Sequence, residues 1–231
     1  MRKIVLILLL AMLTMALSGC LSVMPIGRGG TGISVRGVGD MVTHQIDTDN
    51  FSGINVNGIF TVRYHQAPQA SVVLEIQENL YEFVRIETRS GILRVNSTRS
   101  FEVDLQEGSL MPILHIYAPY LSSIDLNGMA VTEDWDILVT SNLRISVNGM
   151  SYLNFTGTIE RLEVSANGMS NVTMEGHAVS ATVTANGMSN VDVYVTDSID
   201  ATAHGMSSIT YRGNPGTVRE TTSGMSNITS R

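Results

Sequence analysis

Lysine is nearly absent from this 231-residue chain: Lys3 is the only one, and arginine supplies the remaining positive charge. Cysteine is as scarce: Cys20 stands alone, so no disulfide can form within the chain and the fold must be held by packing. Aromatic residues make up only 6% of the sequence. The one long apolar run, residues 4–16, is too short to span a bilayer comfortably. These absences exclude a disulfide-stapled scaffold and argue against a membrane-spanning protein.

Negative charge dominates the rest of the sequence. After residue 19 there are 12 arginines against 21 aspartates and glutamates, which gives a net charge of −9. Nucleic acids and anionic lipid surfaces both reward clustered positive charge, so no nucleic acid is expected among the partners. The 212 residues from Cys20 to Arg231 are still long enough to bury a sizeable core.

The first twenty residues have the three parts of a bacterial export signal. Arg2 and Lys3 precede the apolar run, and residues 17–20 (Leu-Ser-Gly-Cys) match the lipobox, whose cysteine is acylated and becomes the new N-terminus. We therefore expect a lipoprotein signal peptide over 1–19, and an acylated Cys20 that anchors the protein to a lipid membrane. Leu21, where an aspartate often signals inner-membrane retention, favours the outer membrane of a Gram-negative bacterium. The alternative is a secreted protein with an incidental cysteine.

Residues 20–45 are expected to be the lipidated cysteine and a flexible glycine-rich tether, and residues 46–231 a single domain. Alternating apolar residues begin near Phe51 and are typical of β-strands. Strands are expected near 54–62, 71–76, 83–87, 92–95 and 112–117, with a hairpin turn at Arg89–Gly91 and a short helical turn within 78–84.

The dipeptide Gly-Met returns six times in the second half of the chain, at intervals of 21, 19, 19, 18 and 19 residues. A sustained period near 19 is typical of a solenoid, whose coils bury their apolar faces only by stacking on neighbours. The sequence therefore predicts an all-β fold: a parallel β-helix-like solenoid with about 19 residues per coil over about 121–231, preceded by a short β-rich region. Its predicted corners are Asn127, Gly128, Met129, Asn148, Gly149, Met150, Asn167, Gly168, Met169, Asn186, Gly187, Met188, His204, Gly205, Met206, Ser223, Gly224 and Met225.

Each coil carries two stretches with period-two apolar residues, which predict two short strands with one inward face. The first stretch supplies Leu143, Ile145, Val147, Leu162, Val164, Ala166, Ala181, Val183, Ala185, Ile199, Ala201 and Ala203. The second supplies Leu153, Phe155, Val172, Met174, Val191, Val193, Ile209 and Tyr211.

The corner sequence Asn-Gly-Met favours a left-handed bend at one or both of its first two residues, because asparagine and glycine tolerate positive φ. We expect each methionine to point inward and fill the bend with its adaptable side chain. A row of thioethers could instead bind a soft metal such as Cu(I), but no metal or cofactor is expected. The asparagine row is expected to be a structural ladder of amides, with a ligand-binding comb as its alternative.

No constellation in the sequence indicates catalysis. The histidines at 44, 65, 115, 177 and 204 lack metal-ligand spacing, and we expect each to be isolated. The acidic groups 133–136 and 192–200 are expected to be solvated loops rather than calcium sites. Polysaccharide-cleaving β-helix enzymes need grouped carboxylates, or basic residues beside a carboxylate, whereas the arginines here are scattered through the coils. The chain is therefore not expected to be an enzyme.

Three stretches carry a resemblance to a known family. They are 51–58 (Phe-Ser-Gly-Ile-Asn-Val-Asn-Gly), 116–121 (Ile-Tyr-Ala-Pro-Tyr-Leu) and the repeated Asn-Gly-Met-Ser. Together they resemble the bacterial envelope domain called putative auto-transporter adhesin, head GIN domain, over roughly Phe51–Arg231. The resemblance implies a right-handed parallel β-helix-like solenoid, found in exported or lipid-anchored proteins of Gram-negative bacteria. It implies no catalytic residues.

The predicted function is that of a non-catalytic, lipid-anchored protein of the cell envelope. Its polar outer face would bind an unknown protein or glycan partner, for example in adhesion. One alternative is a carbohydrate-active β-helix enzyme. Another is a self-assembling envelope protein, a homo-oligomer that pairs through the open strand edge of its last coil.

Overall fold

The computed structural model describes residues 34–102 and 111–231. All of the described residues belong to one compact unit, Ser34–Arg231. The predicted signal peptide and Cys20 lie outside the described residues. Within the described ranges, no helix is long and apolar enough to cross a bilayer.

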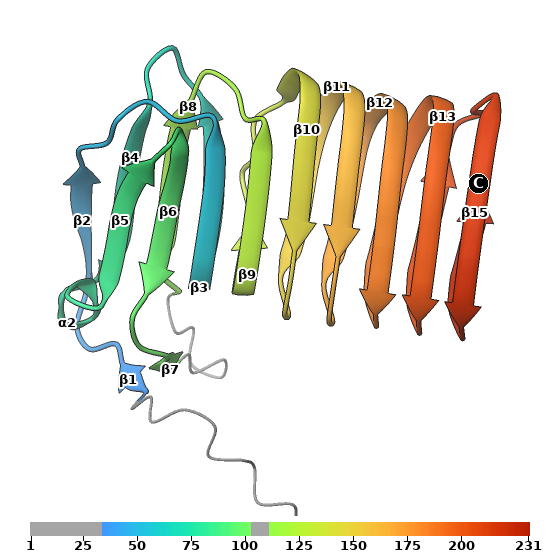
Figure 1. Cartoon of the computed structure of the whole chain (residues 1–231). Helices are drawn as coiled ribbons and strands as arrows, with labels where there is room; N and C mark the ends of the chain where they lie inside the picture. The colour runs from blue at the N-terminus through green and yellow to red at the C-terminus, as the bar shows by residue number, and fades with distance from the viewer. Residues whose placement is uncertain (1–33, 103–110) are drawn as a thin grey trace, which may run out of the picture. The chain divides into compact units, whose positions relative to one another are not determined.

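The second half of this unit is a β-solenoid whose coils follow one another in chain order (Figure 1). All strand pairs in it are parallel, and equivalent residues of successive coils pair along most of each strand, so that Leu162 pairs with Ala181 and Ala181 with Ile199. The predicted fold, with a spacing of about 19 residues per coil, is therefore confirmed. Its strands are β9 (Ser123–Thr132), β10 (Leu138–Val147), β11 (Tyr152–Ala166), β12 (Asn171–Gly187), β13 (Asn190–Gly205), β14 (Ser208–Arg212), β15 (Thr217–Gly224) and β16 (Asn227–Ser230).

Local irregularities explain the intervals that depart from 19. In the longest coil, the chain leaves β9 at Thr132 and re-enters the sheet at Leu138, after a loop that contains Trp135. In the shortest coil, the pairing of β12 with β13 shifts register between Thr173 and Ser180. Both changes fall away from the Gly-Met corners, which stay in register.

The first half of the unit extends the same stack. Strand β3 (Gly53–Gln66) pairs in parallel with β9, which sets Asn57-Gly58 beside Asn127-Gly128 as one more corner. The remaining elements are β1 (Val35–Arg36), β2 (Met41–Ile46), β4 (Ser71–Gln77), α2 (Glu78–Tyr81), β5 (Val84–Arg89), β6 (Ile92–Ser97), β7 (Phe101–Glu102) and β8 (Ile113–Ala118). Strand β1 pairs with β7, and β2 pairs with β4. The end of the range expected to be a tether, 34–45, thus contains paired strands.

The hairpin β5–β6 forms where the sequence predicts it, with Arg89 paired to Ile92. Ser90 and Gly91 both have positive φ, 52° and 74°. Two successive positive φ values define the type I′ turn, whose twist matches that of the flanking strands.

The core is a single apolar layer between the two faces of the coils. All of the inward residues predicted for the two strands of each coil are buried, and several are fully so, including Val147, Leu153 and Ala166. The column of inward residues just before the corners changes from Val147 to the smaller alanine at Ala166, Ala185 and Ala203, each with no exposed surface.

The last described coil departs from this apolar pattern. Its inward positions opposite Ala201 and Ala203 are Glu220 and Thr222. The Glu220 carboxylate accepts a hydrogen bond of 2.9 Å from the Tyr211 hydroxyl. An inward-pointing charge at a sheet edge disfavours the addition of another strand. This residue therefore weighs against assembly through β15.

Candidate functional site

The Gly-Met corners stack directly on one another. Gly168 has a φ of +81°, and a Cβ on it would lie 2.8 Å from the carbonyl oxygen of Gly149. The amide of Met169 donates to that same oxygen at 2.8 Å, and Met188 repeats the bond to Gly168. The asparagines are not left-handed, since the only described non-glycine residues with positive φ are Ser90 and Asp134. The bend therefore belongs to glycine alone.

The asparagine amides form a ladder along the stack. Asn148 donates to Asn127 at 2.9 Å, Asn167 to Asn148 at 2.9 Å and Asn186 to Asn167 at 2.8 Å. Each central amide is both donor and acceptor and is half-buried. The row continues as a contact between the His204 ring and the Ser223 hydroxyl at 2.5 Å. This geometry agrees with the structural ladder rather than with a comb that offers free amides to a ligand.

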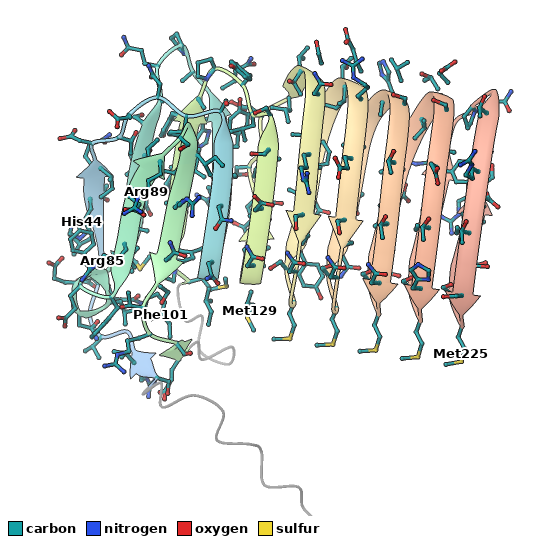
Figure 2. The ribbon with its side chains drawn as sticks, viewed as in Figure 1. His44, Arg85, Arg89, Phe101, Met129 and Met225 are labelled. Carbon is teal, nitrogen blue, oxygen red and sulfur yellow. The ribbon has the colours of Figure 1, made fainter. Side chains whose placement is uncertain are left out.

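The expectation that methionine points inward is wrong. In the coils after the first, these side chains are 42% to 78% exposed, and Figure 2 shows them projecting from one edge of the solenoid. We call these five residues the methionine edge: Met150, Met169, Met188, Met206 and Met225. Met129, at the first Gly-Met corner, is partly buried.

The residue that fills the bend is the serine after each methionine. Ser170 and Ser189 have no exposed surface. Their hydroxyls donate to Val147 O at 3.1 Å and Ala166 O at 3.0 Å. The in-and-out alternation passes through the corner unbroken: Val147, Ser151 and Leu153 are separated by even numbers of residues and are all buried, whereas Met150 points out. The repeated Asn-Gly-Met-Ser held this signal, but an inward serine contradicts the usual preference for apolar cores.

An open groove runs along the outer face of one side of the coils. It has a volume of about 800 Å³ and crosses β10, β11, β12, β13 and β15. Two rows of outward side chains flank it, one at each side of the inward residues Leu143, Leu162, Ala181 and Ile199. The first row is Asn142, Arg161, Ser180, Ser198 and Thr217; the second is Arg144, Glu163, Thr182, Asp200 and Arg219. We call it the arginine groove.

Arginines that look scattered in the sequence meet in this groove, because the 19-residue period places them on neighbouring strands. Arg161 donates through Nε to the Asn142 amide oxygen at 2.7 Å, which orients its guanidinium. Arg144 and Arg219 are 69% and 78% exposed, and each lies 3.9 Å from a carboxylate. Such exposed ion pairs are weak, so both guanidiniums stay available to a ligand. The groove has one more positive than negative charge, in an acidic protein.

Asp125 lies in register with Ser146, next to the position of Arg144. Burial raises the pKa of this carboxyl, while a hydrogen bond from Asn55 and the charge of Arg144 act in the opposite direction. Asp125 does not line the groove, but its carboxyl is close enough for the charge of Arg144 to act on it.

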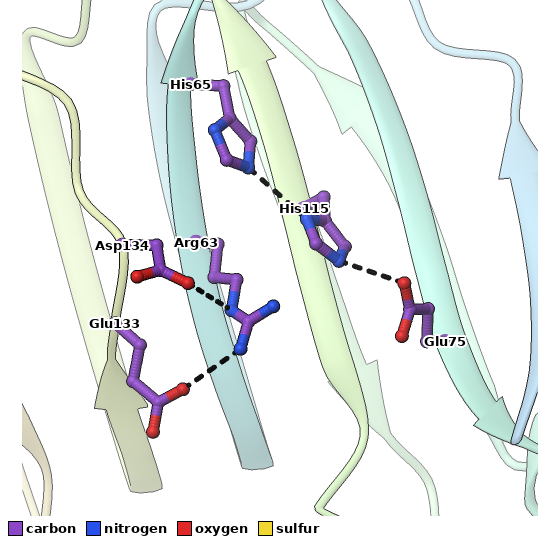
Figure 3. A network of polar contacts seen from close by, with 6 residues as sticks. All are labelled: Arg63, His65, Glu75, His115, Glu133 and Asp134. Atoms are coloured by element: carbon purple, nitrogen blue, oxygen red, sulfur yellow. Dashed lines mark hydrogen bonds and ion pairs between the residues drawn. The ribbon is translucent and has the colours of Figure 1, made fainter.

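The acidic group 133–136 is not a free solvated loop. Arg63 of β3 reaches both Glu133 at 3.2 Å and Asp134 at 3.3 Å (Figure 3). The Asp136 carboxylate accepts a hydrogen bond of 2.8 Å from the backbone amide of Gln66. Beside them lies a second hollow of about 390 Å³, lined among others by Trp135 and Glu175. The looser acidic group is also paired, since Asp192 lies 3.0 Å from Arg212.

Two histidines expected to be isolated lie together. His65 Nε2 is 3.3 Å from His115 Nδ1, and His115 Nε2 is 3.2 Å from the Glu75 carboxylate (Figure 3). They come from β3, β8 and β4, which are neighbours in the sheet although distant in sequence. His44 likewise stacks on Tyr81, with ring centroids 3.7 Å apart. Among the described residues, no group of three or more His, Cys, Asp or Glu is arranged to hold a metal ion.

A parallel solenoid that carries an open polar groove along its coils has the architecture of repeat proteins that present extended binding surfaces. The chain belongs to the family described as putative auto-transporter adhesin, head GIN domain, whose model matches residues 50–215. The family resemblance noted in the sequence is thereby confirmed. A search of curated proteins finds no match.

Solved structures share the fold. A putative adhesin from Bacteroides fragilis aligns with a TM-score of 0.60 at 17% identity, over 86% of this chain and all of that one. A putative adhesin from Parabacteroides distasonis gives 0.53 at 18% identity, over 85% and 100%. A protein from the same species described as a putative lipid binding protein gives 0.51 at 16% identity, again over 85% and 100%. At these identities the likeness concerns the fold alone.

Proposed function

We propose that this protein is a non-catalytic, adhesin-like protein of the cell envelope that binds an extended, anionic glycan in its arginine groove. The observation that carries the proposal is the groove itself: three arginines gathered along five strands of a protein with excess negative charge. Its membership in an adhesin family supports an exported, cell-surface protein. The groove crosses several coils, as a linear polymer requires.

The chemistry of the groove suits carboxylate- and hydroxyl-bearing sugars. Guanidinium groups bind carboxylates through paired hydrogen bonds, and the small hydroxyls of Ser180 and Ser198 leave space between the charged ends. Glu163 and Asp200, the two acids of the groove, each lie 3.9 Å from an arginine as partners in exposed ion pairs.

Binding should depend on the arginines of the groove. In Arg144→Ala/Arg161→Ala protein, we expect the affinity for an acidic polysaccharide such as polygalacturonate to fall at least about tenfold, because two charge-assisted contacts are lost. The affinity can be measured by calorimetry with a Cys20→Ser protein, which cannot be acylated.

Arg89→Ala is the matched control. Arg89 is 69% exposed and pairs with Glu87 on the hairpin β5–β6, away from the groove. It should bind as the parent does. Equal loss in both variants would show a general charge effect. No binding by the parent to any member of an acidic glycan array would contradict the proposal.

We also propose that Cys20 is acylated and holds the protein at the outer membrane. The lipobox at residues 17–20 supports this, and attachment by two or more acyl chains is stable where one chain is marginal. The solved neighbour described as a putative lipid binding protein is compatible with a place at a membrane.

Palmitate labelling tests the anchor directly. The parent should incorporate label and fractionate with outer membranes, whereas Cys20→Ser should lose all label and move to the soluble fraction. Ser18→Ala, which keeps a small residue in the lipobox, is the control and should still be labelled. An unlabelled parent would contradict the anchor without affecting the groove.

A further inference from the structure

The methionine edge is an unusual surface for an acidic protein. Its five side chains leave the solenoid at equivalent positions of successive coils, so their backbones are spaced by about 4.8 Å, the distance between paired strands. They project in the same direction (Figure 2). Their exposure, from 42% at Met150 to 78% at Met225, makes them a continuous apolar strip rather than isolated surface residues.

Charge is missing from this edge. The five corner sequences that carry the exposed methionines, over 148–152, 167–171, 186–190, 204–208 and 223–227, contain no Asp, Glu, Lys or Arg. His204 is the only histidine among them. The asparagine amides behind the methionines are already hydrogen-bonded to one another. This edge can therefore enter a less polar medium without removing a charge or a free amide from water.

The chain enters the folded unit on this same edge. The corner row begins at Gly58, where a Cβ would lie 2.9 Å from Cβ of Ser97, the last residue of β6. Strand β7 follows shortly and pairs with β1, and both lie below the corners in Figure 1. Cys20 precedes Ser34 by 14 residues, a distance that the chain can span over at most about 50 Å.

We propose that the methionine edge lies against the lipid bilayer, with its thioether side chains inserted among the lipid headgroups. The proposal rests on the proposed acylation of Cys20, which keeps the domain within reach of the membrane. A tethered surface has a high effective concentration at its target, so five modest apolar contacts are enough to orient the domain. Methionine suits a fluid lipid surface because its side chain is unbranched and flexible. This orientation directs the coils away from the bilayer.

Oxidation of methionine in the acylated, full-length protein tests this orientation. In phosphatidylcholine vesicles, the five edge methionines should be converted to the sulfoxide by hydrogen peroxide at least about fivefold more slowly than in the Cys20→Ser protein without lipid. Met174 of β12, which is fully buried, is the internal control and should react slowly and equally in both. Mass spectrometry of proteolytic peptides gives the rate at each methionine.

Mutation gives a second readout that does not need the anchor. Cys20→Ser protein should co-sediment weakly with the same vesicles, and changing all five edge methionines to glutamine should reduce that binding at least about tenfold. Val139→Gln/Val179→Gln, which changes two exposed valines away from the edge, should leave it unaltered. Circular dichroism of each variant checks that it is folded.

The outcomes separate the two proposals. Edge methionines that react at the same rate in anchored and lipid-free protein would overturn the bilayer contact while leaving acylation intact. Protection that appears without lipid, either at high protein concentration or on addition of Ag⁺ or Cu(I), would assign the edge to a second copy or to a soft metal and would also overturn it. A Cys20 without label would overturn the proposed anchor. The contact between the methionine edge and the bilayer would then be tested only by co-sedimentation of the soluble protein with vesicles.

Discussion

A Gly168→Ala substitution is expected to destabilise the domain by about 2–4 kcal/mol, although it adds one methyl group. Two costs combine. Alanine at a φ of +81° is strained, and its Cβ would lie 2.8 Å from the carbonyl oxygen of Gly149, closer than such atoms can approach. That oxygen also accepts the amide of Met169, so the coils cannot separate without losing a bond. Urea denaturation of the Cys20→Ser protein measures the loss.

Two other glycines separate these costs. Gly91 has a φ of +74° but open space around it, so Gly91→Ala carries only the backbone strain of about 1 kcal/mol. Gly216 has ordinary φ, and its nearest neighbour, Asp197 O, lies at 3.9 Å, so Gly216→Ala should be close to neutral. The expected order of stability is thus Gly216→Ala, then Gly91→Ala, then Gly168→Ala. A Gly168→Ala protein as stable as Gly216→Ala would show that the glycine stack is not required.

Stability should also fall steeply above pH 10, by up to about 2–3 kcal/mol at pH 12, through Tyr64. Burial, and to a smaller extent the charge of Asp136, raises the pKa of this tyrosine from 10.0 to about 12. The folded state therefore holds the proton more tightly than the unfolded state. Its contribution is complete below pH 10 and is lost as the pH rises to about 12.

The scarcity of lysine makes this measurement unusually clean. Lysine titrates near pH 10.4 in most proteins, but after residue 19 this chain has none, and arginine stays protonated. Tyrosines are therefore the main groups that titrate in this window. The difference between the urea midpoints at pH 9 and pH 11.5 should be smaller in Tyr64→Phe than in the parent. This variant also loses the hydrogen bond of 3.1 Å to Ala118 O at all pH values.

Tyr194→Phe is the control, because Tyr194 is 38% exposed. It should retain the slope of the parent. Part of the slope should survive in Tyr64→Phe as well, since burial raises the pKa of Tyr211 in the same direction. A slope unchanged by Tyr64→Phe would mean that another group governs the alkaline transition.

Periodic residues are what the sequence predicted well. A 19-residue spacing determines which side chains stack, so Leu162, Ala181 and Ile199 could be placed in one inward column before any coordinates were known. The direction of methionine was predicted wrongly, because hydrophobicity was given more weight than the spacing. Val147 and Leu153 are six residues apart, so an unbroken period of two places Ser151 inward and Met150 outward, as the structure has them.

The sequence also did not predict the contacts between segments that lie outside the repeats. Arg63 reaches Glu133 and Asp134, and His65 meets His115, only because β3 lies between β8 and β9 in the sheet. Nothing in the sequence fixes that strand order, since the first half has no period. The arginine groove could be predicted in part. The 19-residue period determines which side chains form its two rows, whereas its concave shape depends on how the chain bends between strands.

In-register stacking also couples the size of the two surfaces. Inserting or deleting one 19-residue unit would lengthen or shorten the arginine groove and the methionine edge by the same ~4.8 Å, without changing the chemistry of either. Relatives with more units would then have both a longer groove and a longer methionine edge. The length of glycan that such a protein can hold would therefore change together with the length of its contact with the membrane.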